Sequence, residues 1–335
     1  MKFALAALLL AGLPATAATL LVANKSDDTL DVLDLASGET VARLETGHAP
    51  HEVAVSPDGT LAVVANYGDR TDPGSTLTVI DLSGPKIVRT ISLAPHQRPH
   101  GVAWIDGERL AVTTEGSRHL LVVDVARGEI VDAIPTGENV SHMVAIDPEL
   151  HRAFVANIGS GSVTAIDLSS GRKLRDIETG EGAEGIALRP GTNEIWVTNR
   201  AADTISILDG KSLQVVLRRE AKGFPIRIAF TPDGSRALVS AASSGEVILW
   251  DAAERREIRR AKLDLRTAPD AAQRLFGDQF GDSPVPVGLV ISADGRSAFV
   301  AATQADAVVV IDTETLEIRD VLRAGREPDG MALVP

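Results

Sequence analysis

Three histidines recur at one position of a repeated pattern, and this recurrence is the strongest chemical signal in the sequence. His51, His100 and His142 each occupy the second position of a short apolar run, as in residues 50–55 (PHEVAV) and 99–104 (PHGVAW). Neutral imidazole nitrogens bind divalent transition metals such as Zn, Cu, Fe or Ni. If the fold places equivalent positions side by side, the three rings converge on one metal ion or one polar ligand.

The pattern that carries these histidines occurs seven times, and most copies are 42 residues apart. A unit of this length that is built from short strands is the size of one blade of a β-propeller. The first strand of each blade surrounds the central axis, so equivalent residues form a ring there. Around that ring the sequence places, in order, Asp329, His51, His100, His142, Glu184, Ile226 and Val287. We therefore expect a metal site of His51, His100 and His142, with Glu184 or Asp329 nearby.

Each repeat reads as four β-strands, because β-branched and apolar residues alternate with polar ones between turn signals. The two ends of the chain do not hold complete repeats. Residues 330–334 read as a first strand, whereas residues 19–24 begin with a second strand. Joined, they complete one blade and close the ring, which leaves no open sheet edge. The prediction is an all-β, seven-bladed propeller, formed by residues 18–335 as a single domain and closed by its N- and C-terminal strands.

The recurring segments Val-Ala-Asn, Val-Ile-Asp and Ser-Pro-Asp-Gly, as in residues 155–157, 79–81 and 56–59, resemble the YVTN-type β-propeller repeat family. The resemblance covers the whole chain after residue 17. It implies an exported or surface propeller, and some relatives accompany quinoprotein dehydrogenase systems. A shared fold does not by itself transfer any of these functions.

Two polar positions are present in most blades and are interpreted as architectural. An aspartate ends the third strand in all seven repeats. It precedes a Ser/Thr/Gly turn and can accept hydrogen bonds from the backbone N–H groups of that turn. These residues are Asp34, Asp81, Asp124, Asp167, Asp209, Asp251 and Asp312. An asparagine ends the second strand in four repeats, at Asn24, Asn66, Asn157 and Asn199, and we interpret Glu115 as the exception at that position.

The face of the propeller that carries the loops before the first strand and after the second strand is the expected binding face. Six of the seven histidines fall on or beside these loops, and His151 is the exception. The two departures from the regular spacing, residues 67–75 and an insertion at 267–284, lie on the same face. Long loops on a rigid scaffold are common places for binding. We expect residues 268–276 to form a short helix and the insertion to lie over or beside the mouth of the channel.

The first residues predict export. A positive start at Met1-Lys2, an apolar run over residues 3–13 and small residues at 15–17 are typical of a signal peptide, residues 1–17. That run is shorter than the roughly 20 apolar residues of a membrane-spanning helix. We therefore expect a periplasmic or secreted protein without a membrane span. The formal net charge of −13 and the absence of cysteine disfavour a nucleic-acid partner, disulfides and Cys-ligated metals.

Three classes of function remain open. The first is an exported module that binds a divalent transition metal or a small ligand, or that serves a protein partner in a periplasmic redox or uptake system. The second is a metal-dependent lyase or lactone hydrolase with its site at the mouth of the axis. No general base separate from the metal ligands is apparent except Glu115, which argues against an enzyme. The third is a protein-interaction scaffold. No segment indicates a nucleotide cofactor, because the glycines at residues 159–161 precede no helix.

Overall fold

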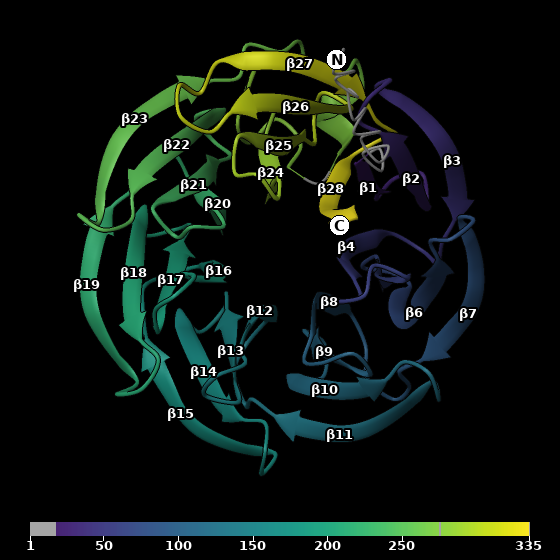
Figure 1. Ribbon diagram of the computed structural model, residues 1–335, viewed down its shortest axis with the longest axis vertical. Helices are drawn as coiled ribbons and strands as arrows, with labels where there is room; N and C mark the ends of the chain where they lie inside the picture. Colours follow the sequence, from purple (N-terminus) through teal and green to yellow (C-terminus); the bar gives the residue numbers. More distant parts are fainter. Residues whose placement is uncertain (1–17, 275, 335) are drawn as a thin grey trace, which may run out of the picture.

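The protein is a ring of seven four-stranded antiparallel sheets around a central axis, as the computed structural model shows (Figure 1). The structure describes residues 18–274 and 276–334, so the expected signal peptide lies outside the described residues. The predicted all-β, seven-bladed propeller is confirmed. Among the residues described, no helix has the length and apolar character needed to cross a membrane.

Within each blade the four strands follow one another from the axis outwards. The closing blade contains β28 (Pro328–Val334), β1 (Thr19–Asn24), β2 (Thr29–Asp34) and β3 (Glu39–Glu45). The next two contain β4 (Pro50–Val55), β5 (Leu61–Gly68), β6 (Pro73–Asp81) and β7 (Lys86–Ser92), then β8 (Pro99–Trp104), β9 (Arg109–Thr114), β10 (His119–Asp124) and β11 (Glu129–Pro135). Two more contain β12 (Ser141–Asp147), β13 (Arg152–Asn157), β14 (Ser162–Asp167) and β15 (Arg172–Glu178), then β16 (Ala183–Leu188), β17 (Glu194–Asn199), β18 (Thr204–Asp209) and β19 (Gln214–Glu220). The last two contain β20 (Pro225–Phe230), β21 (Arg236–Ala241), β22 (Glu246–Asp251) and β23 (Arg256–Lys262), then β24 (Pro286–Ile291), β25 (Ser297–Ala302), β26 (Ala307–Asp312) and β27 (Ile318–Arg323).

The core lies between the blades. The second and third strands of a blade are covered on both faces by neighbouring blades, and they read as nearly continuous apolar runs such as AFVA in β13. In one such layer, Phe154 and Ala156 of one blade pack with Ile195 and Val197 of the next. The fourth strands form the rim, where β15 is largely exposed and mostly polar. Each interface thus holds one layer of the core, and the axis stays free for polar side chains.

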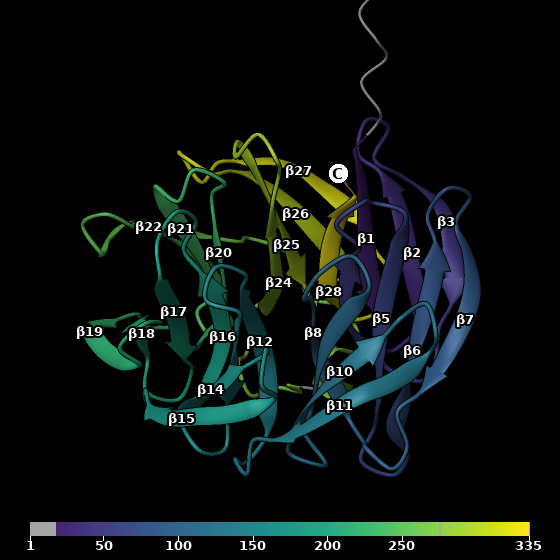
Figure 2. The same cartoon turned by 60° about the horizontal axis from the view of Figure 1, so that its bottom comes forward.

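The ring closes through a blade assembled from both ends of the chain, as the sequence predicted. Strand β1 pairs antiparallel with β28, with Thr19 opposite Val334 and Leu20 opposite Leu333. Figure 2 shows β28 beside β1, and Figure 1 shows β28 next to the axis, where β4 and β8 lie in their own blades. Residues more than 300 positions apart thereby complete one sheet.

The aspartates that end the third strands are architectural, as expected. Each of the seven accepts at least one backbone N–H bond from the following turn, as Asp34 does from Ala36 and Ser37. These bonds hold the turn that leads to the rim strand.

The entry into each first strand positions the residues of the axis. Six of the seven entries pass through a non-glycine residue in the left-handed region of φ, such as Ala49 at 48° and Val140 at 57°. A register shift follows at once, between Pro50 and Val53 in β4 and at the corresponding place in the other first strands. A bulge of this kind releases residues from the ladder and redirects their side chains. The position that held the predicted ligands is therefore a bulge position.

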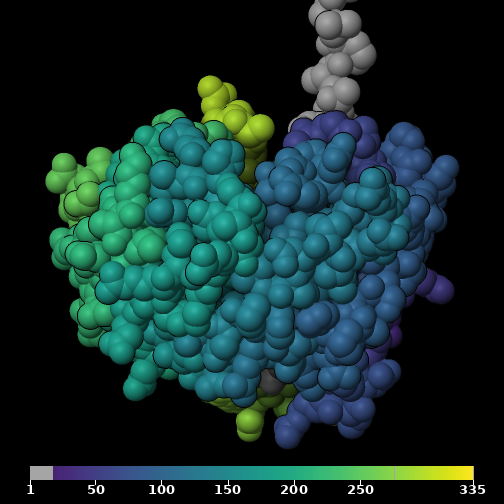
Figure 3. Space-filling view, turned by 90° about the horizontal axis from the view of Figure 1, so that it is seen from below, coloured from purple at the N-terminus to yellow at the C-terminus, as the bar shows by residue number. Residues whose placement is uncertain are grey.

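The insertion after β23 lies at one end of the axis, although it is not the helix that the sequence suggested. The only regular element among the described residues of this segment is the single 3-10 turn η1, Ala271–Gln273. Figure 3 shows this yellow-green segment projecting from the same face as blue loops of an early blade. Gln273, Arg274 and Phe276 line the axial cavity, so the insertion forms part of its wall.

Candidate functional site: a polar cavity on the propeller axis

A cavity of about 640 Å³ opens at this end of the axis, and all seven blades contribute to its wall. Its lining contains two rings of structurally equivalent residues. The first-strand ring consists of the second residues of the first strands and contributes Asp329, His51, His100, His142, Glu184 and Val287 to the wall. The second-strand ring consists of the residues that follow the regular part of each second strand and contributes Lys25, Tyr67, Glu115, Ile158, Arg200 and Thr303.

The second-strand ring is fixed by the same backbone bond in every blade. The N–H of each of its residues donates to the carbonyl of the residue just before a first strand, as from Tyr67 to Ala49 and from Glu115 to Arg98. The corresponding pairs are Lys25–Glu327, Ile158–Val140, Arg200–Gly182, Ala242–Phe224 and Thr303–Val285. The interpretation of Glu115 as the counterpart of the asparagines was wrong by one residue. Thr114 is their counterpart, because it pairs with His119 as Asn157 pairs with Ser162.

The first-strand ring is held by hydroxyl groups of the preceding blade. The side chain of Thr113 donates to the carbonyl oxygen of His142. Ser240 makes the same bond to Val287 at 2.8 Å. Close backbone packing adds to this constraint, because a Cβ at Gly288 would clash with the carbonyl oxygen of Asp329. Side chains of the ring are therefore presented by a rigid scaffold.

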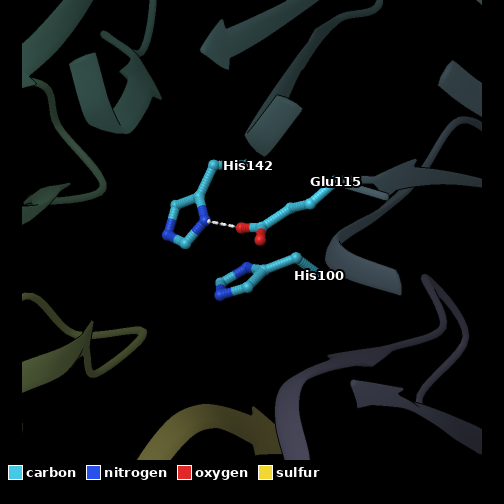
Figure 4. A group of neighbouring side chains, drawn as sticks. All are labelled: His100, Glu115 and His142. Carbon is cyan, nitrogen blue, oxygen red and sulfur yellow. Dashed lines mark hydrogen bonds and ion pairs between the residues drawn. The ribbon is translucent and has the colours of Figure 1, made fainter. Parts of the chain in front are cut away.

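His100, Glu115 and His142 form a compact group on one side of the cavity (Figure 4). One ligand atom of each residue lies within 4.8 Å of the others. The Nδ1 of His142 hydrogen-bonds Oε1 of Glu115 at 2.5 Å, and the rings of His100 and His142 have centroids 3.6 Å apart. The Nδ1 of His100 is buried without a hydrogen-bond partner among the residues that the structure describes. The group thus holds two imidazoles and a carboxylate around one small space.

The pKa values of the two histidines in this group are shifted in opposite directions. Burial and the neighbouring histidines hold the pKa of His100 well below its usual range, so its ring is neutral. Burial also opposes protonation of His142, but the hydrogen bond to Glu115 and the nearby Glu184 outweigh it and raise the pKa of His142. The Nε2 of His142 lies 3.3 Å from Oε1 of Glu184, at ion-pair distance but with poor hydrogen-bond geometry.

His51 lies next to this group and is held by its own partners. Its Nδ1 donates to the carbonyl oxygen of Ala49 at 3.1 Å, which leaves Nε2 as an acceptor. Its ring stacks on Tyr67 with centroids 4.3 Å apart, and it lies 5.0 Å from the ring of His100. The hydroxyl of Tyr67 donates to Oε2 of Glu115 at 2.5 Å. Both oxygens of Glu115 are therefore engaged, which disfavours the role of a free general base.

A buried ion network crosses the axis beside the histidines. The guanidinium of Arg227 contacts Oε1 of Glu52 at 2.6 Å and Oε1 of Glu184 at 3.2 Å. Glu184 lies in the blade next to that of Arg227, whereas Glu52 lies in a blade that is not adjacent to it. Arg200 contacts the other oxygen of Glu184 at 2.6 Å. Burial opposes ionisation of Glu184, but Arg200, His142 and Arg227 lower its pKa to about 2. Glu184 is therefore an anion already matched by protein cations.

The structure brings the five predicted ligands into one cavity but not into one group. His51, His100, His142, Glu184 and Asp329 all line the wall. Two of them, His100 and His142, belong to the compact group, and the carboxylate there is Glu115. His48 also lines the cavity, whereas His96 and His119 contact each other elsewhere, with ring centroids 4.9 Å apart.

The site residues expected from the sequence do not include Arg227, Glu52 or most of the second-strand ring. Arg227 and Glu52 stand at the repeat position that holds glycine in four blades, so a glycine replaced by a charge was the available signal. Ile226 precedes Arg227 in β20, and the repeat register placed it on the first-strand ring. It is instead buried in an apolar cluster with Val287. The second-strand ring could have been found from the variable residues that follow each Val-Ala-Asn segment.

The class of protein defined by this architecture is a seven-bladed propeller with a polar cavity on its axis. The family model described as YNCE-like beta-propeller matches residues 103–274, about half of the chain. The chain therefore belongs to the YncE-like β-propeller family, in agreement with the resemblance noted from its repeats. It is 24% identical over 232 residues to the uncharacterized YncE proteins of Salmonella typhimurium and Salmonella typhi, and the match spans 65% of their length and 66% of this chain.

Solved structures resemble the whole propeller. A functionally unknown protein from Desulfotomaculum acetoxidans has a TM-score of 0.77 and 15% identity, with 94% of this chain and 98% of that chain covered. The hydrazine synthase of Kuenenia stuttgartiensis has a TM-score of 0.70 and 22% identity, with coverage of 89% and 93%. At this level of identity both likenesses concern the fold alone.

Proposed function

We propose that this chain is an exported binding protein that holds one divalent transition metal in its axial cavity, with His100, His142 and Glu115 as ligands. The observation that carries the proposal is the buried, unpartnered Nδ1 of His100 beside the hydrogen-bonded pair of His142 and Glu115. Buried polar nitrogens are nearly always hydrogen-bonded, so an orphaned imidazole nitrogen beside a carboxylate points to a missing ligand.

The donor set suits Zn, Cu, Fe or Ni. Two imidazoles and one carboxylate are borderline ligands that such ions share, and three protein ligands leave a coordination position open. Ligands must lose their protons when a metal binds, and His100 is already neutral. The second oxygen of Glu115 is fixed by Tyr67, which orients the carboxylate as an outer-shell partner does in known metal sites. Of the other residues expected from the sequence, Glu184 lies 3.3 Å from Nε2 of His142 but is engaged by Arg200 and Arg227. The next donor is His51, whose ring lies 5.0 Å from that of His100.

The proposal is tested by metal content and affinity. Protein dialysed against Zn²⁺ or Cu²⁺ and then against metal-free buffer should retain about one ion per chain, measured by elemental analysis. Replacing His100 with Ala should weaken binding by at least about 10-fold to 100-fold, since loss of a direct ligand should cost no less than loss of an outer-shell partner. Thermal unfolding of the metal-free variant should change little, because His100 makes no hydrogen bond through Nδ1.

A matched control is His151→Asn, at an exposed turn where the backbone has φ of 50° and Asn is tolerated. It should bind metal like the wild type. A wild-type chain that retains no stoichiometric ion, or a His100→Ala chain that binds as tightly as the wild type, contradicts the metal site. Strong destabilisation of the metal-free His100→Ala protein would instead assign the histidines to the structure.

A further inference from the structure

Two buried polar atoms of opposite character face the axial cavity from the closing blade. Lys25 follows β1, and its Nζ is a donor that water does not reach; Asp329 lies in β28 and is 4% exposed. Neither Lys25 Nζ nor Asp329 Oδ1 has a hydrogen-bond partner among the residues that the structure describes. Leaving a buried donor and a buried acceptor unsatisfied is costly, so such groups point to an occupant that supplies what they lack.

Lys25 and Asp329 are close but do not satisfy each other. Each is the strongest opposite charge that acts on the other. Burial nevertheless lowers the pKa of Lys25, and it raises the pKa of Asp329 to about 6. No ion pair joins the two side chains among the described residues, so neither group satisfies the hydrogen bonding of the other. A ligand that accepts from Lys25 and donates to Asp329 would complete both.

The wall beside this pair contains two apolar side chains, Val287 and Phe276, among polar ones. Val287 belongs to the neighbouring blade, and Phe276 of the insertion packs against Phe280 with ring centroids 5.2 Å apart. Val287 and Phe276 both line the cavity. Its volume of about 640 Å³ is more than ten times the ~30 Å³ that one water molecule occupies in the liquid, so a single bridging water would not fill it. The occupant therefore needs an apolar body as well as two polar groups.

We propose that the axial cavity binds a small carboxylic acid that carries a hydrogen-bond donor on the carbon next to the carboxylate, that is, a 2-hydroxy or 2-amino acid with an aliphatic side chain. The carboxylate accepts from Nζ of Lys25, and the hydroxyl or ammonium donates to Oδ1 of Asp329. The aliphatic side chain packs against Val287 and Phe276. This site goes beyond the proposed metal centre and uses different residues, so either proposal can fail alone.

The test uses the full chain after removal of metal with EDTA. Titration calorimetry with L-leucine, 2-hydroxy-4-methylpentanoate and 4-methylpentanoate compares an ammonium, a hydroxyl and no donor beside the same carboxylate. At least one of the first two should bind, and 4-methylpentanoate should bind about tenfold more weakly or worse, because it leaves Asp329 unpaired. This comparison uses only the wild-type protein and does not depend on any variant folding.

Variants then assign the residues. Lys25→Met should weaken binding of the better ligand by about tenfold to a hundredfold, since a charge-assisted bond to the carboxylate is lost. Asp329→Asn should weaken L-leucine more than the hydroxy acid, because an amide still accepts from a hydroxyl but no longer balances an ammonium. Lys86→Met is the matched control, because that lysine is 67% exposed on the rim and should leave binding unchanged.

Four outcomes would overturn the proposal. These are no binding of either ligand up to about 10 mM, equal binding of 4-methylpentanoate, unchanged affinity in a folded Lys25→Met chain, and binding that appears only after zinc is added. The last outcome would assign the carboxylate to the metal centre instead of to Lys25 and Asp329.

Discussion

At the scale of single residues, the least expected feature is a buried arginine that holds two carboxylates across the axis. We expect Arg227→Met to destabilise the protein by about 3–5 kcal/mol, because it leaves the buried charge of Glu52 uncompensated and removes one of the cations that match Glu184. Chemical unfolding monitored by circular dichroism measures this change.

The control for Arg227→Met is Arg236→Met. Arg236 pairs with the exposed Glu314, and surface pairs contribute only about 0–1 kcal/mol. Adding Glu52→Gln to Arg227→Met should recover part of the loss. A cost for Arg227→Met no larger than that for Arg236→Met would mean that the network is not a coupled, desolvated unit.

His48 at the rim of the cavity should titrate above a free histidine. Its hydrogen bond to Asp69 and the charge of Asp28 raise its pKa, against partial burial, with both ring nitrogens 3.2 Å from a carboxylate oxygen. A pKa that is raised on folding stabilises the protein below the unfolded pKa, and that contribution is lost as pH rises through the folded pKa. Histidine NMR titration should show His48 as a high-pKa resonance that moves toward the usual value in Asp69→Asn. A His48 pKa at or below the usual value would show that the contacts of His48 with Asp28 and Asp69 are absent in solution.

Residue types and register were enough to predict that His51, His100 and His142 share one cavity, because the fold presents equivalent positions alike. They were not enough to select the compact group. That choice depends on Glu115, whose place in its blade differs by one residue from the position that the repeat pattern suggests, and on Tyr67, which belongs to the same ring. A one-residue shift in a strand changes the face of the sheet on which a side chain lies. An error of one residue in register is therefore enough for the second-strand ring to go unrecognised in the sequence.

At the scale of elements, the strands and turns were predictable and the insertion was not. Strand patterns and Asp-containing turns are local signals, and they repeat seven times. In the insertion the apolar spacing suggested a helix over 268–276, and neither Pro269 at its start nor Gly277 just after it argues against one. Ion pairs hold the segment instead, since Arg274 contacts Asp270, four residues earlier, and Asp306 of the following blade at 2.6 Å each. The contact with Asp306 cannot be inferred from spacing within the segment.

At the scale of the whole molecule, the ring depends on a strand supplied by the last residues of the chain. Deleting residues 330–335 should abolish soluble, cooperative folding. It removes most of β28, uncovers the buried β1 residues Leu20, Leu21 and Val22, and leaves an unpaired inner edge between two blades. It also removes the part of β28 that follows the cavity-lining residue Asp329. Solubility after expression and a thermal unfolding curve measure the effect.

A single substitution in β28 distinguishes the loss of ring closure from the loss of apolar contacts alone. Met331 is 5% exposed and packs with Leu20 and Val22, so Met331→Ala should cost about 2–5 kcal/mol while β28 stays paired and unfolding stays cooperative. The deletion differs in kind, because the closing blade loses its inner strand and the blades on either side of it lose their packing partner. If the chain without residues 330–335 unfolds cooperatively at nearly the temperature of Met331→Ala, then the propeller does not need its terminal strand. Closure of the ring would in that case follow from packing between the blades.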